Sequence, residues 1–303
     1  RDGSGRGDIN VGVSWVPDER LDRLTTLFTP RKRVPATVEF ADIAGRTGAR
    51  ALLDLAPFRQ ADALLHVVRM FRDETVPHPS GSVDPFRDAR AMEDELILAD
   101  LEVVERRLDR VARDLKKGGV AALRAEQSVL ERCRAALESG TPLRALQLES
   151  DADKCLRGFQ LLSAKPLLVV VNLDESDLAP VERAAAMAGF TEFLSGAAVR
   201  AVPACAKMEL EIAQLAPEEA AAFLADLGLE ESGLDRVIRA SYGLLGYVSF
   251  FTVGDDECRA WAIPRGTPAQ GAAREVHSDI ARGFIRAEVV HENHLLARGS
   301  MAA

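Results

Sequence analysis

The sequence predicts an α/β protein in which a parallel sheet is interrupted by a long helical hairpin and followed by a small α+β module. Three observations support this prediction. Short apolar runs alternate with helix-length segments through the first two thirds of the chain. A different apolar period, typical of paired helices, begins at Met92. After Gly243 the apolar runs return at the close spacing of a β-hairpin.

Five segments have the composition of strands. Each is short, rich in Val, Leu, Ile, Phe or Ala, and separated from the next by enough residues for a turn or a helix. In chain order they are 11–16, 37–42, 64–68, 167–171 and 199–203. Because strands that alternate with helices usually pair in parallel, four or five of these segments are expected to form one doubly wound sheet.

The segment that begins at Met92 predicts two paired helices. Apolar side chains recur in it at spacings of three and four residues, which is the pattern of a coiled-coil seam. They are Leu101, Val104, Leu108, Val111, Leu115, Leu123, Leu130, Cys133 and Leu137. Gly118-Gly119 divides the run into two antiparallel helices, and the acids and arginines between the apolar positions are assigned to the solvated face. Since strand 167–171 follows, the hairpin is expected to be an insertion in the sheet domain.

The C-terminal part predicts a small module of strands and a helix. Its elements are strands at 247–253, 258–263 and 284–290, a turn at 254–256 and a helix at 268–281. The chain stops at Ala303 after only three such strands, so the module is expected to be cut short.

Composition limits the classes of function. The 303 residues exceed one average domain, and 47% hydrophobic content supplies a sizeable core. A net charge of −9 argues against sequence-specific DNA binding through the overall field, although a local basic patch could still contact RNA. The four scattered cysteines lack metal-ligand spacing and fit a reducing compartment. No apolar stretch approaches the ~20 residues of a membrane helix, and no signal peptide is visible, so a cytoplasmic protein without a membrane partner is expected.

Two motifs follow successive predicted strands and indicate a base pocket. Asn172-Leu-Asp-Glu comes directly after strand 167–171, and Cys205-Ala206-Lys207 comes after strand 199–203. Ras-like nucleotide-binding domains read guanine with Asn-Lys-x-Asp, whose carboxylate accepts from the guanine N–H groups. Here Leu173 replaces the Lys and Glu175 replaces the Asp. The longer acid and the missing Lys are expected to weaken guanine preference and admit adenine. The plain alternative is a polar loop start.

Asp42-Ile-Ala-Gly45 closes the second predicted strand and fits the Asp-x-x-Gly element of P-loop NTPases. In that element the Asp supports Mg²⁺, usually through water, and the Gly amide can reach the γ-phosphate. The pattern alone is common by chance. It gains weight because Asn172, Glu175 and Lys207 follow in the expected order. Together they predict a site for Mg²⁺ with ATP or GTP.

A further signal comes from short sequence segments that are spread along the chain and are considered together. They are Val-Pro-Ala-Thr-Val-Glu-Phe-Ala-Asp-Ile-Ala-Gly at 34–45, Gly-Ser-Val-Asp-Pro at 81–85, Glu-Leu-Ile-Leu-Ala-Asp-Leu at 95–101, Arg-Ala-Leu at 144–146, Phe-Phe-Thr-Val-Gly at 250–254, Arg-Ala-Trp-Ala-Ile at 259–263, His-Ser-Asp at 277–279 and Arg-Gly-Phe-Ile-Arg-Ala-Glu at 282–288. This set resembles the YchF-type Obg-like ATPases, from about Asn10 to about residue 295.

The resemblance implies a Ras-like P-loop NTPase sheet domain with an inserted α-helical coiled-coil hairpin and a C-terminal α+β TGS domain. The expected division is 1–90 and 157–240 for the nucleotide-binding domain, 91–156 for the hairpin and 241–303 for a C-terminally truncated TGS-like domain. The family's properties imply binding of ATP at least as well as GTP, slow hydrolysis, and association with a ribosome or a ribosome-bound factor. They also imply that His78 assists hydrolysis where the Ras-type Gln is missing; the alternative is an exposed loop His between two prolines.

The chain departs from the family pattern at the phosphate site. The family places a P-loop ending in Gly-Lys-Ser, then a switch Thr, upstream of the Asn-x-Gly-Val strand found here at 10–13, and neither is in this sequence. Gly3-Ser-Gly-Arg-Gly7 cannot replace the P-loop because no Lys follows it to meet the phosphates. Two interpretations stay open. The intact protein is longer and carries these elements upstream, or the chain is a non-hydrolysing adaptor that binds a ribosome or protein partners through the hairpin and TGS module.

Overall fold

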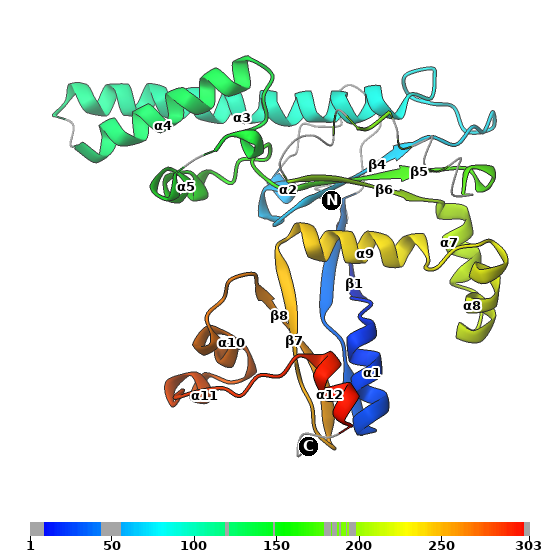
Figure 1. Ribbon diagram of the computed structural model, residues 1–303. Helices are drawn as coiled ribbons and strands as arrows, with labels where there is room; N and C mark the ends of the chain where they lie inside the picture. Colours follow the sequence, from blue (N-terminus) through cyan, green and yellow to red (C-terminus); the bar gives the residue numbers. More distant parts are fainter. Residues whose placement is uncertain are drawn as a thin grey trace, which may run out of the picture. The chain divides into compact units, whose positions relative to one another are not determined.

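The computed structural model describes residues 9–43, 56–118, 121–147, 149–178, 183, 187, 189–191, 193 and 198–299. The chain divides into two compact units, and each has its own core. One unit joins Arg1–Ala44 with Asp235–Ala303, which are far apart in the sequence, and the other is Gly45–Leu234. Figure 1 shows the elements of both. None of the helices in these described ranges is both long and apolar enough to cross a membrane.

The unit 45–234 contains a parallel sheet of three strands in the order β4-β5-β6. The strands are β4 (Leu64–Arg69), β5 (Leu167–Asn172) and β6 (Val199–Ala204). Every residue of β5 up to Val171 is buried, as expected for a central strand covered on both faces. Arg69 lies opposite Asn172, and Asn172 lies opposite Ala204. The carboxyl ends of all three strands therefore meet at one edge, where the candidate motifs lie.

The first two predicted strands do not join this sheet. β1 (Ile9–Trp15) pairs antiparallel with β3 (Thr37–Ile43) in the other unit, and the expectation of four or five parallel strands in one sheet was wrong for these two. Their sequences alternate apolar and polar residues, which is typical of antiparallel strands, whereas the continuous apolar run of β5 is typical of a buried parallel strand. The alternating pattern could therefore have separated these two strands from the parallel strands already in the sequence.

The hairpin consists of α3 (Pro85–Lys116) and α4 (Ala121–Glu138), which lie side by side in Figure 1. Its predicted seam is confirmed, since the central apolar positions of both helices are buried in one cluster. These are Val104, Leu108, Val111, Leu130, Cys133 and Leu137. Burial raises the pKa of the Cys133 thiol to about 11. Across the helices Arg107 donates two hydrogen bonds, of 2.6 and 2.9 Å, to Glu126.

The structure corrects the start of the hairpin. α3 begins at Pro85 rather than near Met92, because Asp84 caps the helix by accepting from the Arg87 N–H at 3.0 Å and a proline occupies the first turn. Proline is well suited to this position because its missing N–H would have no partner in the helix. The first two turns of α3 thus lie within the segment assigned to the sheet domain.

Two acids of α3 are buried and fasten the hairpin to the segment before β5. The Asp100 carboxylate accepts from the Leu162 N–H at 2.9 Å and from both the N–H and hydroxyl of Ser163 at 2.6 and 2.8 Å. Glu93 pairs with Arg144 in the short 3₁₀ helix Leu143–Ala145. The periodicity argument could not find these contacts because it counts apolar positions only.

In the other unit β7 (Tyr247–Thr252) and β8 (Glu257–Pro264) form the predicted antiparallel hairpin. β2 (Lys32–Val34) runs parallel beside β8. Helices α1 (Glu19–Phe28) and α9 (Gly233–Leu244) contribute Leu21, Ile238 and Tyr242 to the core with these strands. The described residues also form the helices α2 (Ala56–Gln60), α5 (Ser150–Leu156), α7 (Ala206–Ile212), α8 (Pro217–Asp226) and α12 (Glu292–Arg298), with 3₁₀ helices at Arg157–Phe159 and Glu175–Asp177.

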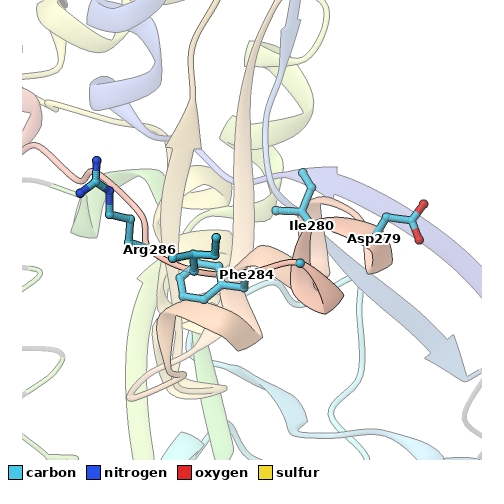
Figure 2. A pocket seen from close by; sticks show the side chains of 6 residues that line it. Asp279, Ile280, Phe284 and Arg286 are labelled. Carbon is cyan, nitrogen blue, oxygen red and sulfur yellow. The ribbon is translucent and has the colours of Figure 1, made fainter.

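The end of the chain differs from its prediction in two places. The predicted helix 268–281 is two helices, α10 (Ala269–Val276) and α11 (Ser278–Arg282), with His277 as the cap between them. The predicted strand 284–290 pairs with no strand of the described chain, and Ile285 is 92% exposed. The N–H and C=O groups of a strand need a neighbouring strand as hydrogen-bond partner, and an apolar pattern alone does not supply one. Figure 2 shows Asp279 and Arg286 at opposite sides of the open hollow that this segment lines with α11.

Candidate functional site

The two predicted base-pocket motifs lie together at the carboxyl ends of β5 and β6. The side-chain oxygen of Asn172 accepts from the Ala206 N–H at 3.0 Å. The Asn172 carbonyl accepts from the N–H groups of Met70 and Phe71 at 2.9 and 3.2 Å. Asn172 therefore ties the end of β5 to the start of α7 and to the loop after β4.

Glu175 and Lys207 form an ion pair at the surface beside Asn172. The Lys207 Nζ lies 2.7 Å from Glu175 Oε1, and the side chains are 73% and 39% exposed. The hydrogen bond from Glu175 raises the pKa of Lys207. An ion pair in solvent contributes little net free energy, so a base that donates to Glu175 can displace the ammonium. Both side chains of the pair are thus accessible to a ligand from solvent.

Leu173 and Cys205 are buried. Leu173 is 1% exposed and packs in the core of the parallel sheet, and its N–H donates to the Ala204 carbonyl at 2.8 Å. Cys205 occupies the cap position of α7, and burial raises the pKa of its thiol. Neither side chain faces solvent, so both positions can act on a base only through their backbone. A Lys at position 173 would place an ammonium in the core.

A contact that the sequence did not predict braces the end of β6. Glu209 of α7 accepts from the N–H groups of Gly233 and Leu234 at 2.7 and 3.1 Å. A Cβ added at Gly233 would lie 2.8 Å from Glu209 Oε1 and 3.1 Å from the Ala204 Cβ. Glycine is required here because the chain approaches both groups closely. The helix that carries Lys207 is therefore fixed to the start of α9.

His78 lies in the loop between β4 and α3, and both its ring nitrogens are engaged. Nε2 lies 3.0 Å from Asp88 Oδ2, and Nδ1 accepts from the Ser80 N–H at 3.1 Å. The His78 side chain is only 11% exposed. The alternative of an exposed loop histidine does not describe this side chain, because it is docked against the first turn of α3.

Arg69, at the end of β4, organises the loop that carries His78. Its guanidinium donates to the carbonyls of Phe71, Asp73 and Val76 at 3.1, 2.9 and 2.7 Å. It also lies 4.4 Å from the centre of the Phe71 ring. Because one planar side chain satisfies three carbonyls, the loop keeps a defined path from the sheet edge. Sequence reasoning missed Arg69; its position directly after an apolar strand was the only signal.

Asp42 belongs to the unit that contains β3, whereas Gly45 is the first residue of the unit 45–234. Asp42 lies on β3 opposite Asn10 and is exposed, whereas Gly45 lies outside the described residues. Within the described ranges no group of three or more His, Cys, Asp or Glu side chains could hold a metal. A single carboxylate fits Mg²⁺ that arrives with phosphates, because this ion keeps several waters and takes one or two carboxylates from protein.

Comparison with known proteins identifies the family. Residues 247–303 match the family model YchF-GTPase_C, described as a protein of unknown function (DUF933). The chain is 42% identical to the ribosome-binding ATPase YchF of Bacillus subtilis (strain 168) and 38% identical to that of Escherichia coli O157:H7, in each case over 97% of this chain and 82% of the relative. The structure of the Schizosaccharomyces pombe YchF GTPase matches with a TM-score of 0.84 at 29% identity, over 97% of this chain and 80% of that one. The chain therefore belongs to the YchF family.

Proposed function

We propose that this chain binds ATP or GTP together with Mg²⁺, hydrolyses the nucleotide slowly and works in association with a ribosome. The observation that carries the proposal is the meeting of Asn172, Glu175 and Lys207 at the carboxyl ends of β5 and β6. Ligands of open α/β sheets bind at this edge. Relatives named ribosome-binding ATPase and YchF GTPase support both the proposed nucleotide binding and the proposed association with a ribosome. The location that goes with a ribosome is the cytoplasm.

In this proposal Glu175 is the group that reads the base. Its carboxylate accepts from N–H groups on the base edge once Lys207 moves aside. Asn172 holds the start of α7 in place, and the backbone of Leu173, Cys205 and Ala206 lines the pocket. Because the acid is one methylene longer than the Asp of a guanine reader, adenine is accepted at least as well as guanine.

Shortening this acid tests its role. Glu175→Asp is expected to move the ratio of GTP to ATP affinity toward GTP by about fivefold, because the shorter carboxylate approaches the geometry that accepts from guanine. The measurement is competition of unlabelled ATP and GTP against a fluorescent nucleotide in the full-length protein. Glu218→Asp, the same change at an exposed position of α8, is the control. An unchanged ratio in Glu175→Asp would exclude the carboxylate from base reading.

Hydrolysis in this proposal depends on positioning and charge stabilisation rather than on a covalent step. His78 is assigned the role of orienting the attacking water. By the pattern of the Asp-x-x-Gly element, Asp42 would support the metal through a water and the amide of Gly45 would reach the γ-phosphate. Mg²⁺, when bound with the nucleotide, neutralises charge that develops on the phosphates.

The hairpin is proposed as the surface that meets the ribosome or a ribosome-bound factor. Together with the hairpin, three arginines of the C-terminal module are candidates for this surface: Arg259, Arg282 and Arg286. In the structure these arginines pair with acids of the same module: Arg259 with Glu257 at 2.6 Å, Arg282 with Asp279 at 2.6 Å and Arg286 with Glu288 at 4.0 Å. Because each of these arginines has an acid of its own module within ion-pair distance, the hairpin is the stronger candidate.

Removal of the hairpin tests this surface. Deleting residues 102–137 and joining the ends with a short Gly/Ser linker removes both halves of the buried seam together, so few unpaired apolar residues remain. The variant is expected to bind nucleotide with unchanged affinity and to lose most of its co-sedimentation with ribosomes. Co-sedimentation that stays the same, at matched salt and with nucleotide present, would remove the hairpin from the interface.

A further inference from the structure

The docked position of His78 depends on one carboxylate of α3. Asp88 lies in the first turn of that helix and meets the imidazole through Oδ2, 3.0 Å from Nε2. The other ring nitrogen accepts from the Ser80 N–H, two residues along the same loop. The loop turns back at Gly81, whose φ of 77° is in the left-handed region. The ring is therefore held from two sides, by its own loop and by α3.

This position prevents the ring from acting on a water molecule. A neutral imidazole has one N–H donor and one nitrogen lone pair. Here the Nε2–H donates to Asp88, and the Nδ1 lone pair accepts from the Ser80 backbone. No lone pair remains to accept a hydrogen bond from water, which a group that orients or deprotonates water requires. The ring must leave at least one partner before it can contribute to hydrolysis.

Asp88 is itself held in place. Its Oδ1 accepts from Nε and one terminal nitrogen of Arg87 at 3.0 and 2.9 Å. Arg87 also donates to the hydroxyl and the carbonyl of Ser82 at 2.9 and 2.7 Å. Oδ1 is thereby occupied and Oδ2 is left facing His78. The carboxylate is fixed by the start of α3 and does not need to reorganise to accept the ring.

We propose that Asp88 is a positioning residue that holds His78 in a docked, inactive position, so that hydrolysis requires the imidazole to leave this carboxylate. The proposal rests on the role of His78 in the proposed function and adds a control on it. In this proposal Asp88 acts on hydrolysis only through its contact with the histidine. Its removal is expected to favour the released ring and so to accelerate hydrolysis.

The kinetic test compares variants of the full-length protein under single-turnover conditions with Mg²⁺ and ATP. Asp88→Ala is expected to raise the hydrolysis rate by about fivefold, the effect of losing one hydrogen bond to a charged group, with unchanged nucleotide affinity. Asp88→Glu retains a carboxylate and is expected to return the rate to within about twofold of the parent. Asp73→Ala removes a charge of the same sign from the loop that carries His78, where Asp73 contacts Thr75, and is expected to leave the rate unchanged. An unchanged or lower rate in Asp88→Ala overturns the proposal.

A second measurement reads the docked ring without hydrolysis. In protein labelled with ¹⁵N-histidine, the His78 signals, assigned by their loss in His78→Gln, are expected to show a protonated Nε2 and an unprotonated Nδ1. In Asp88→Ala they are expected to shift toward a mixture of the two tautomers, and in Asp88→Glu to return to the parent values. Equal signals in parent and Asp88→Ala overturn the docked position. If no variant hydrolyses nucleotide, the proposed function fails, and the ¹⁵N signals still decide whether Asp88 holds the ring.

Discussion

Replacing His78 with Ala is expected to slow single-turnover hydrolysis by about a hundredfold and to leave nucleotide affinity unchanged. The imidazole contributes by orienting the attacking water, an interaction made in the transition state and not in the bound ground state, so its loss affects the rate and not the binding. The measurement is the conversion of ATP to ADP by excess full-length protein with Mg²⁺.

A matched control is His291→Ala, which removes an exposed histidine at the cap of α12. It is expected to hydrolyse ATP at the parental rate. If His78→Ala and His291→Ala both retain the parental rate, His78 has no part in hydrolysis and the catalytic assignment is wrong.

The second large effect is expected from Asp100→Asn, which should lower the free energy of unfolding of the unit 45–234 by about 3 kcal/mol. Asp100 is fully buried and its carboxylate accepts from two backbone N–H groups and one hydroxyl, while Arg59 approaches at 3.5 Å. The amide of Asn has one acceptor oxygen in place of two, and its NH₂ group would face a donor. At least one buried N–H would then lose its partner.

Urea denaturation followed by circular dichroism measures this change. Asp109→Asn makes the same substitution at an exposed position of α3, and its effect is expected to stay within about 0.5 kcal/mol. An equal, small effect at both positions would show that the Asp100 contacts do not hold the hairpin to the sheet unit.

Elements with a strong apolar pattern were predictable from sequence. The run Leu-Leu-Val-Val-Val before Asn172 has the composition of a buried central strand, and the structure has β5 there. The heptad-like seam predicted both helices of the hairpin, because apolar positions decide which face of a helix is buried. The meeting of Asn172, Glu175 and Lys207 was also predictable, since the carboxyl ends of adjacent parallel strands lie at one edge.

What the sequence did not reveal depends on contacts between distant residues. Asp100 and Ser163 are 63 positions apart, and nothing in either local sequence marks the acid as buried rather than solvated. Asp88 contacts His78 because the path of the loop brings the histidine back to α3, and nothing in the local sequence of the helix indicates this contact. Leu173 was assigned to a base pocket from its place in a motif, yet the strand's alternation directs its side chain into the core. Side-chain partners of this kind follow from the path of the chain and not from periodicity.

We propose that this protein binds purine nucleotides at the edge formed by β5 and β6. Titration of the full-length protein with fluorescent ATP and GTP analogues, in the presence of Mg²⁺, tests it most directly. The expected result is saturable binding of both, with ATP bound at least as tightly as GTP and a difference on the order of 1 to 2 kcal/mol, or roughly tenfold. Absence of saturable binding, or strong selectivity for GTP, would contradict the claim.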